Sequence, residues 1–195
     1  MSEAGVDVRS LRSRVRAAQH SRSLPLIVIG ILLVNYGVGQ FDRSPVRWQY
    51  GAPLAFILLW VLANTIEGRV GVGRGRADYL VAAGFVFTAT SLVTLRPFTD
   101  WLNTGTEVTG VWIIIIGVAL LGLAAAGSDL VLAVAGSVVA ADGIQTIAYG
   151  SHDSYGPGIF NNPATQATHF AITGWVGAAL VVAGLLYYRV ERRAI

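Results

Sequence analysis

The chain has 195 residues, of which 54% are hydrophobic and only 13% are charged. Soluble domains carry about 25% charged residues, so this composition favours an integral membrane protein. The absence of cysteine excludes disulfides, thiolate metal sites and thiol nucleophiles. Lysine is also absent, which excludes Schiff-base chemistry and makes all 14 basic residues arginines.

Long apolar runs separated by short polar segments predict an all-helical, polytopic bundle. We expect six helices, each close to the ~20 residues that cross a ~30 Å hydrocarbon layer. Their expected ranges are 24–41, 51–67, 78–95, 107–126, 129–149 and 168–188. Residues 23–190 then form the transmembrane domain, and 191–195 form a short tail. The basic segment 1–22 is either an amphipathic helix on the inner leaflet or a disordered tail.

The arginines predict the orientation, because cytoplasmic loops retain positive charge during insertion. With the amino terminus inside, only Arg43, Arg47 and Arg96 lie outside. Both termini are therefore expected in the cytoplasm, in a multi-pass protein of the cell membrane. Trp112 and Trp175 fall at expected outer interfaces, where tryptophan is favoured. The candidates for contact with anionic lipid headgroups are Arg9, Arg12, Arg16, Arg69, Arg74 and Arg76.

An internal repeat is suggested by Gly30, Gly84 and Gly136, which are 54 and 52 residues apart and each lie in an outward-going helix. Three helical hairpins entering from one side would follow. With Pro45 and Pro97 in the first two outer loops, this pattern resembles the HdeD-type family of small six-helix membrane proteins linked to acid resistance. The resemblance covers most of the chain and implies a stress-related membrane role, without identifying a catalytic residue. The long third outer loop and Asp142 depart from the family's pattern.

Asp142 is an acid within the fifth predicted helix, in the outer half of the membrane. A carboxylate facing lipid there costs at least ~2.5 kcal/mol, so Asp142 should face the bundle interior or water, or be protonated. Gln145 shares its helix face. Asp142 either bonds a neighbouring helix or serves proton passage, ion passage or substrate binding. The expected bonding partners are Asn35, Thr88, Thr90 or Ser91.

The third outer loop, residues 150–169, is the longest connection and carries His152, Asp153, Asn161 and Asn162, with His169 at the start of the sixth helix. Together with Asp142 these residues are compatible with a metal site, a proton relay or an ordinary polar loop. Their spacing matches no metal motif, so we assign no metal and expect no cofactor.

Three functions stay open on the sequence. The first is a small transport-type or accessory membrane protein whose outward-opening polar region handles a proton, an ion or a small solute. The second is a non-catalytic subunit of a larger membrane complex. The third, an enzyme acting on lipid or isoprenoid, is the less economical interpretation because no catalytic motif is present. The candidate binding or relay residues are Asp142, Gln145, His152, Asp153, His169 and Asn35.

The expected partners are membrane lipids and either further copies of the chain or a partner membrane subunit, with no nucleic acid. The abundance of alanine, glycine, valine and arginine suggests a prokaryotic source.

Overall fold

A computed structural model describes residues 23–39, 46–70, 76–93, 105–153 and 163–193. These residues form six helices and no strand, which confirms the predicted all-helical class. The helices are α2 (Ser23–Gly39), α3 (Val46–Val70), α4 (Arg76–Val93), α6 (Gly105–Gly127), α7 (Leu130–Asp153) and α8 (Pro163–Arg193). The basic segment 1–22 lies outside the described residues.

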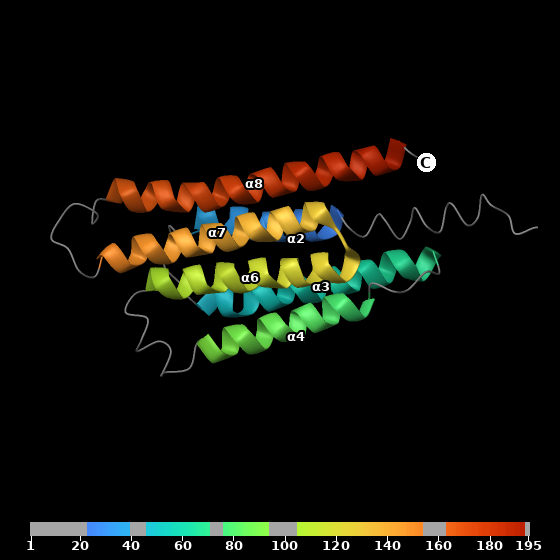
Figure 1. Ribbon diagram of the computed structural model, residues 1–195, viewed down its shortest axis with the longest axis horizontal. Coiled ribbons are helices and arrows are strands. Elements are labelled where there is room, and N and C mark those ends of the chain that lie inside the picture. Colours follow the sequence, from blue (N-terminus) through green and yellow to red (C-terminus); the bar gives the residue numbers. More distant parts are fainter. Residues whose placement is uncertain (1–22, 40–45, 71–75, 94–104, 154–162, 194–195) are drawn as a thin grey trace, which may run out of the picture.

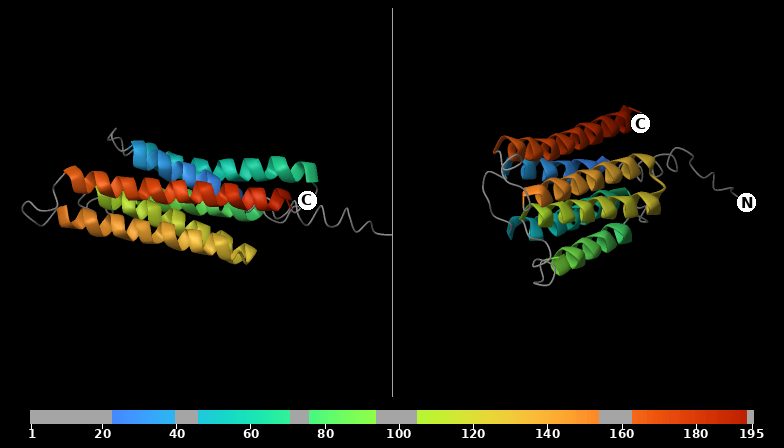
Figure 2. Two further views of the ribbon diagram at one scale, coloured as in Figure 1. Left: turned by 90° about the horizontal axis from the view of Figure 1, so that it is seen from above. Right: turned by 60° about the vertical axis from the view of Figure 1, so that its left-hand side comes forward.

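The helices lie roughly side by side along the long axis of the molecule, with α8 at one edge and α4 at the opposite edge (Figures 1 and 2). The most extensive contacts join α6 to α7, α2 to α8, and α3 to α4. These closest pairs differ from the predicted hairpins, because α2 packs far more on α8 than on its sequence neighbour α3. The first and last of the described helices therefore pack against each other.

Reciprocal glycine contacts bring α6 and α7 together. A Cβ added to Gly117 would lie 2.6 Å from the Ala140 nitrogen and 2.8 Å from the Gly136 carbonyl oxygen. A Cβ added to Gly143 would lie 2.7 Å from the Gly110 carbonyl oxygen. The glycines on each helix are seven residues apart, so they return to the same face after about two turns. The two backbones touch directly at two levels.

Reciprocal glycine contacts also join α2 to α8. A Cβ on Gly30 would lie 2.7 Å from the Gly177 carbonyl oxygen, and a Cβ on Gly177 would lie 2.7 Å from that of Gly30. Gly184 packs against Ile27 in the same interface. Close approach of small residues is the usual way that apolar helices associate in lipid. Lipid tails are as apolar as the side chains, so the hydrophobic effect does not drive the helices together there.

Gly84 behaves differently from Gly30 and Gly136, its counterparts in the suggested repeat. It is exposed on α4, and a Cβ built there meets nothing within 4 Å. Two of the three aligned glycines therefore serve helix contacts and the third does not. The repeat itself stays a prediction.

The turn between α6 and α7 is closed by backbone hydrogen bonds. The Asp129 amide donates to the Ala124 carbonyl at 2.9 Å, and the Ser128 amide donates to that of Ala125 at 3.4 Å. Ser128 has a φ of 51°, as the left-handed residue of this helix ending requires. The Asp129 side chain then caps α7 by accepting from the amides of Val131 at 3.0 Å and Leu132 at 3.2 Å.

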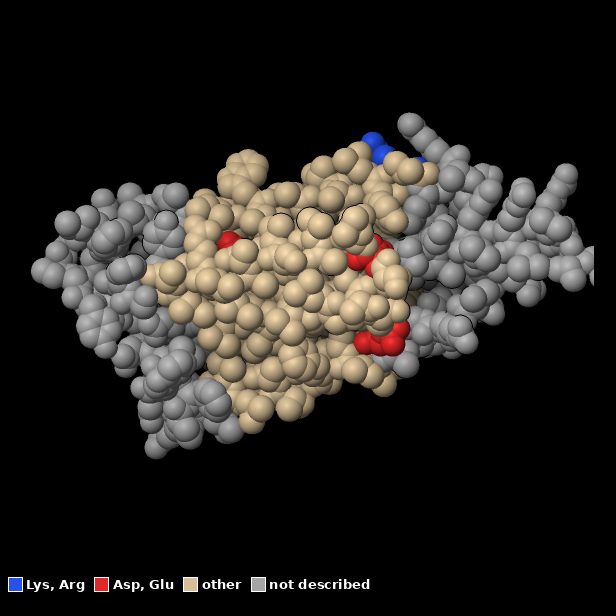
Figure 3. Space-filling model, viewed as in Figure 1, with Lys and Arg blue, Asp and Glu red and all other residues tan. Residues whose placement is uncertain are grey.

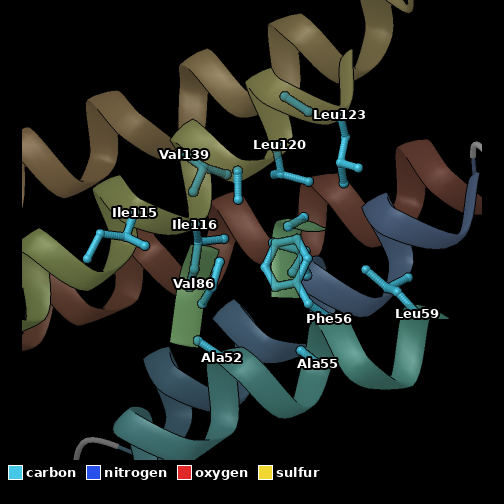
Figure 4. Packing of buried hydrophobic residues seen from close by; sticks show 14 of the residues in the cluster. Ala52, Ala55, Phe56, Leu59, Val86, Ile115, Ile116, Leu120, Leu123 and Val139 are labelled. Carbon is cyan, nitrogen blue, oxygen red and sulfur yellow. The ribbon is translucent and has the colours of Figure 1, made fainter. Parts of the chain in front are cut away.

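The hydrophobic core draws residues from all six described helices. Figure 4 shows the part of it that lies between α3, α4 and α6, with Val139 of α7 at one side. Phe56 and Val86 are fully buried there, opposite Ile116 and Leu120 of α6. Trp60 packs against this core, as its mid-helix position predicts. The α6–α7 pair is thereby fixed on α3 and α4.

Three helices are long and apolar enough to cross a membrane: they contain the spans Thr109–Gly127, Leu130–Ala148 and Ala171–Val190. The apolar parts of α2, α3 and α4 are shorter. The molecule also exposes many large apolar side chains, Leu130 and Val81 among them, at 78% and 70%. Apolar exposure on this scale favours a lipid environment.

Three helices extend further than the sequence predicts. The second helix was predicted to begin at residue 51, yet α3 begins at Val46 and contains Pro53. Helix α7 continues to Asp153 and α8 begins at Pro163. The predicted loop of residues 150–169 is therefore largely helical at both ends.

We predict that Gly117→Ala lowers the free energy of unfolding by about 1–3 kcal/mol, because its methyl group must displace the backbone of α7. Gly122→Ala on the same helix is the matched control: its added Cβ meets nothing within 4 Å, and alanine favours helix. Unfolding in detergent measures both variants. Equal stability of Gly117→Ala and Gly122→Ala would contradict the close contact of α6 and α7.

Candidate functional site: a buried acid in a polar interior

Asp142 is set apart from the other charged side chains that the structure describes. Asp78 lies in the first turn of α4, Asp129 precedes α7, and Arg189 lies in the last turns of α8. These three share one end of the bundle, called the inner end from its predicted orientation. Figure 3 shows red at that end and one further red patch within the apolar surface. Asp142 alone among the four lies away from the inner end, within the apolar span of α7.

The Asp142 side chain is buried, as a carboxylate at this depth requires. The residue is 4% exposed, and both carboxylate oxygens are enclosed. Val139 and Thr146 lie three residues before it and four residues after it on the same face, and they are 0% and 1% exposed. Since Val139 belongs to the hydrophobic core, this face of α7 points into the bundle. The predicted inward orientation of Asp142 is thus observed.

Buried hydroxyl groups lie in the outer part of the bundle, both on α7 itself and on other helices. Thr146 donates its hydroxyl hydrogen to the backbone carbonyl of Asp142 at 2.8 Å. Thr173 of α8 and Thr109 of α6 are 1% and 7% exposed, and both lie toward the outer ends of their helices. The phenolic oxygen of Tyr36, near the outer end of α2, is enclosed as well. We call Asp142, Thr146, Thr109, Thr173 and Tyr36 the outer polar set.

Most of the bonding partners predicted for Asp142 point elsewhere. Asn35 and Thr88 are exposed on α2 and α4. Thr90 is buried, but its hydroxyl donates to the carbonyls of Val86 at 2.7 Å and Phe87 at 3.1 Å within α4. A threonine that bonds the preceding turn has its donor occupied by its own helix. Asn35 in particular is turned away from the bundle interior that contains Asp142.

The remaining candidates are only partly placed. Gln145 is half-buried on α7, one residue before Thr146. His152 and Asp153 belong to the last turn of α7, and His169 lies inside α8, but their side chains lie outside the described residues. Asn161, Asn162, Arg9, Arg12, Arg16 and Arg74 also lie outside the described residues. Arg69 and Arg76 belong to the ends of α3 and α4, but their side chains are not described. The proton relay that includes both histidines stays a prediction.

Trp112 was expected at the outer interface, and its burial contradicts this. It is 2% exposed and belongs to the core. Within the described part of the chain its indole Nε1 is enclosed without a hydrogen-bond acceptor. Trp175, in contrast, is 75% exposed, in keeping with an interfacial position. A tryptophan near a helix end suits both an interface and a core, so sequence position alone does not distinguish them.

Metal binding finds no support in the described residues, which contain no group of three or more histidine, aspartate or glutamate side chains able to hold an ion. The outer polar set contains one carboxylic acid and four hydroxyl groups, all buried in the outer part of the bundle. A carboxylic acid exchanges a proton, and hydroxyl groups accept and donate hydrogen bonds.

Fold and site together define an all-helical bundle with three candidate membrane spans and a buried acid. Comparison with protein-family models, curated proteins and solved structures finds no match. The resemblance to the HdeD-type family therefore stays a prediction.

We predict that an acid one residue away from Asp142 is poorly tolerated. Ala141 is exposed on an adjacent face of α7, about 100° around the helix from Asp142, so Ala141→Asp places a carboxylate against hydrocarbon at a cost of at least ~2.5 kcal/mol. Ala141→Asn is the uncharged control and should cost less. Membrane yield and unfolding in detergent measure the effect. Native stability of Ala141→Asp would show that this face of α7 does not contact lipid.

Proposed function

We propose that the protein is a small transport-type membrane protein in which Asp142 takes up and releases a proton. The observation that carries this proposal is the burial of the Asp142 carboxylate inside the bundle, within the apolar span of α7. Acids at such positions are costly, and they commonly mark proton or ion pathways. A purely structural role is filled at lower cost by small residues and hydroxyl groups, both abundant in this bundle.

The proposal includes six membrane crossings with both termini in the cytoplasm. Its support is the eleven-to-three distribution of arginines in the sequence. Asp78, Asp129 and Arg189 lie together at one polar end of the bundle, which is the cytoplasmic end in this orientation. In this orientation the outer polar set lies on the extracytoplasmic side of the membrane centre, and protons would reach Asp142 from that side.

A proton is the simplest cargo for this arrangement. Proton uptake needs one acid that changes its charge, and neighbouring hydroxyl groups that accept and donate hydrogen bonds in either state. Ca²⁺ and similar cations require six or more oxygen ligands. Tyr36 and Thr173 supply hydroxyl groups without adding charge. Thr146 can only accept a hydrogen bond from the acid, because its own hydrogen is donated to the Asp142 carbonyl. Small solutes that move together with the proton remain part of the proposal.

A second candidate function is an accessory subunit that docks on a partner helix. The observation in its favour is the outward face of α4, where Gly84 and Thr88 lie one turn apart and are both exposed. Every added Cβ on the paired glycines of α6 and α7 meets an opposing backbone, whereas that of Gly84 meets nothing. A small-residue face of this kind accepts a helix from another chain.

The transport proposal predicts that Asp142→Asn abolishes proton flux, because the amide keeps the shape of the acid but does not titrate. Asp129→Asn is the matched control: the same exchange is made at the inner end, where asparagine also caps a helix. Purified protein in liposomes containing a pH-sensitive dye, energised by a potassium diffusion potential, measures the flux. We expect a fall of at least about tenfold for Asp142→Asn, as for the loss of a required acid-base group.

Three results separate the alternatives. Flux through the native protein that Asp142→Asn retains would refute the role of Asp142. No flux through the native protein, combined with stable co-purification of another membrane protein, would favour the accessory subunit. Loss of folding in Asp142→Asn, checked by circular dichroism, would identify the acid as a structural bond between helices.

A further inference from the structure

An apolar groove runs between α4 and α6 on the outside of the bundle. It has a volume of about 330 Å³. Its inner end is formed by Asp78 and Ala126, and it extends past Gly122 to Phe85 and Val118. Apart from the carboxylate of Asp78, the side chains that line it are apolar. The groove thus has a hydrocarbon-like body and one acidic end.

The dimensions of the groove select its occupant. From Asp78 to Phe85 the helical rise is about 10 Å. Over that length, a volume of about 330 Å³ accommodates a segment of one hydrocarbon chain. Phe85 and Val118 are 44% and 43% exposed, so a chain can enter from the side.

The charge at the inner end selects the headgroup. Asp78 is exposed in the first turn of α4, at the level where the apolar part of α4 begins. A carboxylate at the headgroup level of a hydrocarbon groove favours an amphiphile that carries a cationic group in its headgroup. A primary ammonium donates hydrogen bonds to a carboxylate, whereas a quaternary ammonium does not.

We propose that this groove binds one ethanolamine phospholipid, with an acyl chain against Gly122 and Phe85 and the ammonium group on Asp78. The proposal rests on the membrane location proposed above and is independent of any role for Asp142. In a bilayer the chain gains little from leaving water, because it is already in hydrocarbon. Selectivity between lipids therefore comes from the headgroup. The groove is occupied because the bound chain fills a space that bulk lipid chains fill poorly, and so gains van der Waals contacts.

The site is tested by native mass spectrometry of the full chain, released from bilayers that contain equal amounts of ethanolamine, choline and glycerol phospholipids with identical acyl chains. We expect the native protein to retain the ethanolamine lipid over the other two. Asp78→Asn should lower that preference about twofold to fivefold, the range for one exposed charge pair. Asp129→Asn, which changes another carboxylate at the inner end outside the groove, should retain it.

A second pair of variants tests the groove itself. Gly122→Leu places a side chain in the groove, and Gly84→Leu places the same side chain on the outer face of α4. A Cβ at either glycine meets nothing within 4 Å, so neither substitution clashes with the bundle. We expect Gly122→Leu to lower retention of the ethanolamine lipid to the level of the choline lipid, and Gly84→Leu to leave it unchanged. Circular dichroism checks that both variants fold.

Equal retention of the three lipids by the native protein would overturn the proposal, as would an Asp78→Asn protein that keeps the preference. Preferential retention of the glycerol lipid, which is anionic, would contradict the proposal and assign the retained lipid to arginines instead. Equal losses in Gly122→Leu and Gly84→Leu would show general lipid contact and no site. Proton flux measured on the same variants keeps the two proposals apart: Asp78→Asn should lower the lipid preference while flux through Asp142 continues.

Discussion

The close approach of two helix pairs is the constraint on which the rest of this structure depends. At Gly110 and Gly117 of α6, and at Gly136 and Gly143 of α7, the space that a Cβ would need is already filled by the opposite backbone. The pair of Gly30 and Gly177 does the same for α2 and α8. The chain has few charged residues and many apolar residues on every side of its helices. Close backbone contact is then the source of specificity, because apolar faces alone do not choose between partners in lipid.

The position of the buried acid follows from this packing. With Gly136 and Gly143 turned toward α6, the face of α7 that carries Val139, Asp142 and Thr146 is turned into the bundle. Pairing of α2 with α8 brings Tyr36 and Thr173 to the outer part of the same bundle. A helix that rotated by one residue would bring Ala141 inward and expose Asp142 to hydrocarbon, so the glycine contacts and the acid require the same orientation of α7.

The sequence predicted the six helices well, because long apolar runs interrupted by arginine-bearing loops leave few alternatives. It also predicted that Asp142 faces the bundle interior or water, or is protonated, because a carboxylate facing lipid is too costly; the first of these is what the structure shows. It did not predict which helices pair, because Gly84 looks like Gly30 and Gly136 in the sequence and differs only in what lies opposite it. Asn35 was expected to face a neighbouring helix and is exposed, while Thr173 and Tyr36 were missed as buried polar groups. Hydroxyl groups are common in apolar helices, so the sequence does not distinguish Thr173 and Tyr36 from other hydroxyl-bearing residues. Only their burial in the structure does.

The central claim is that Asp142 lies in a polar interior that opens to the outer side. The absence of native cysteine allows a direct measurement, because a single introduced thiol is then the only one in the chain. Asp142→Cys and Val138→Cys would be treated with a small water-soluble thiol reagent, added to either side of sealed membranes. Val138 is 44% exposed on the outside of the bundle and serves as the lipid-facing control. The account predicts reaction of Asp142→Cys from the outer side and no reaction of Val138→Cys. Reaction of Asp142→Cys only from the inner side, or from neither side, would contradict it.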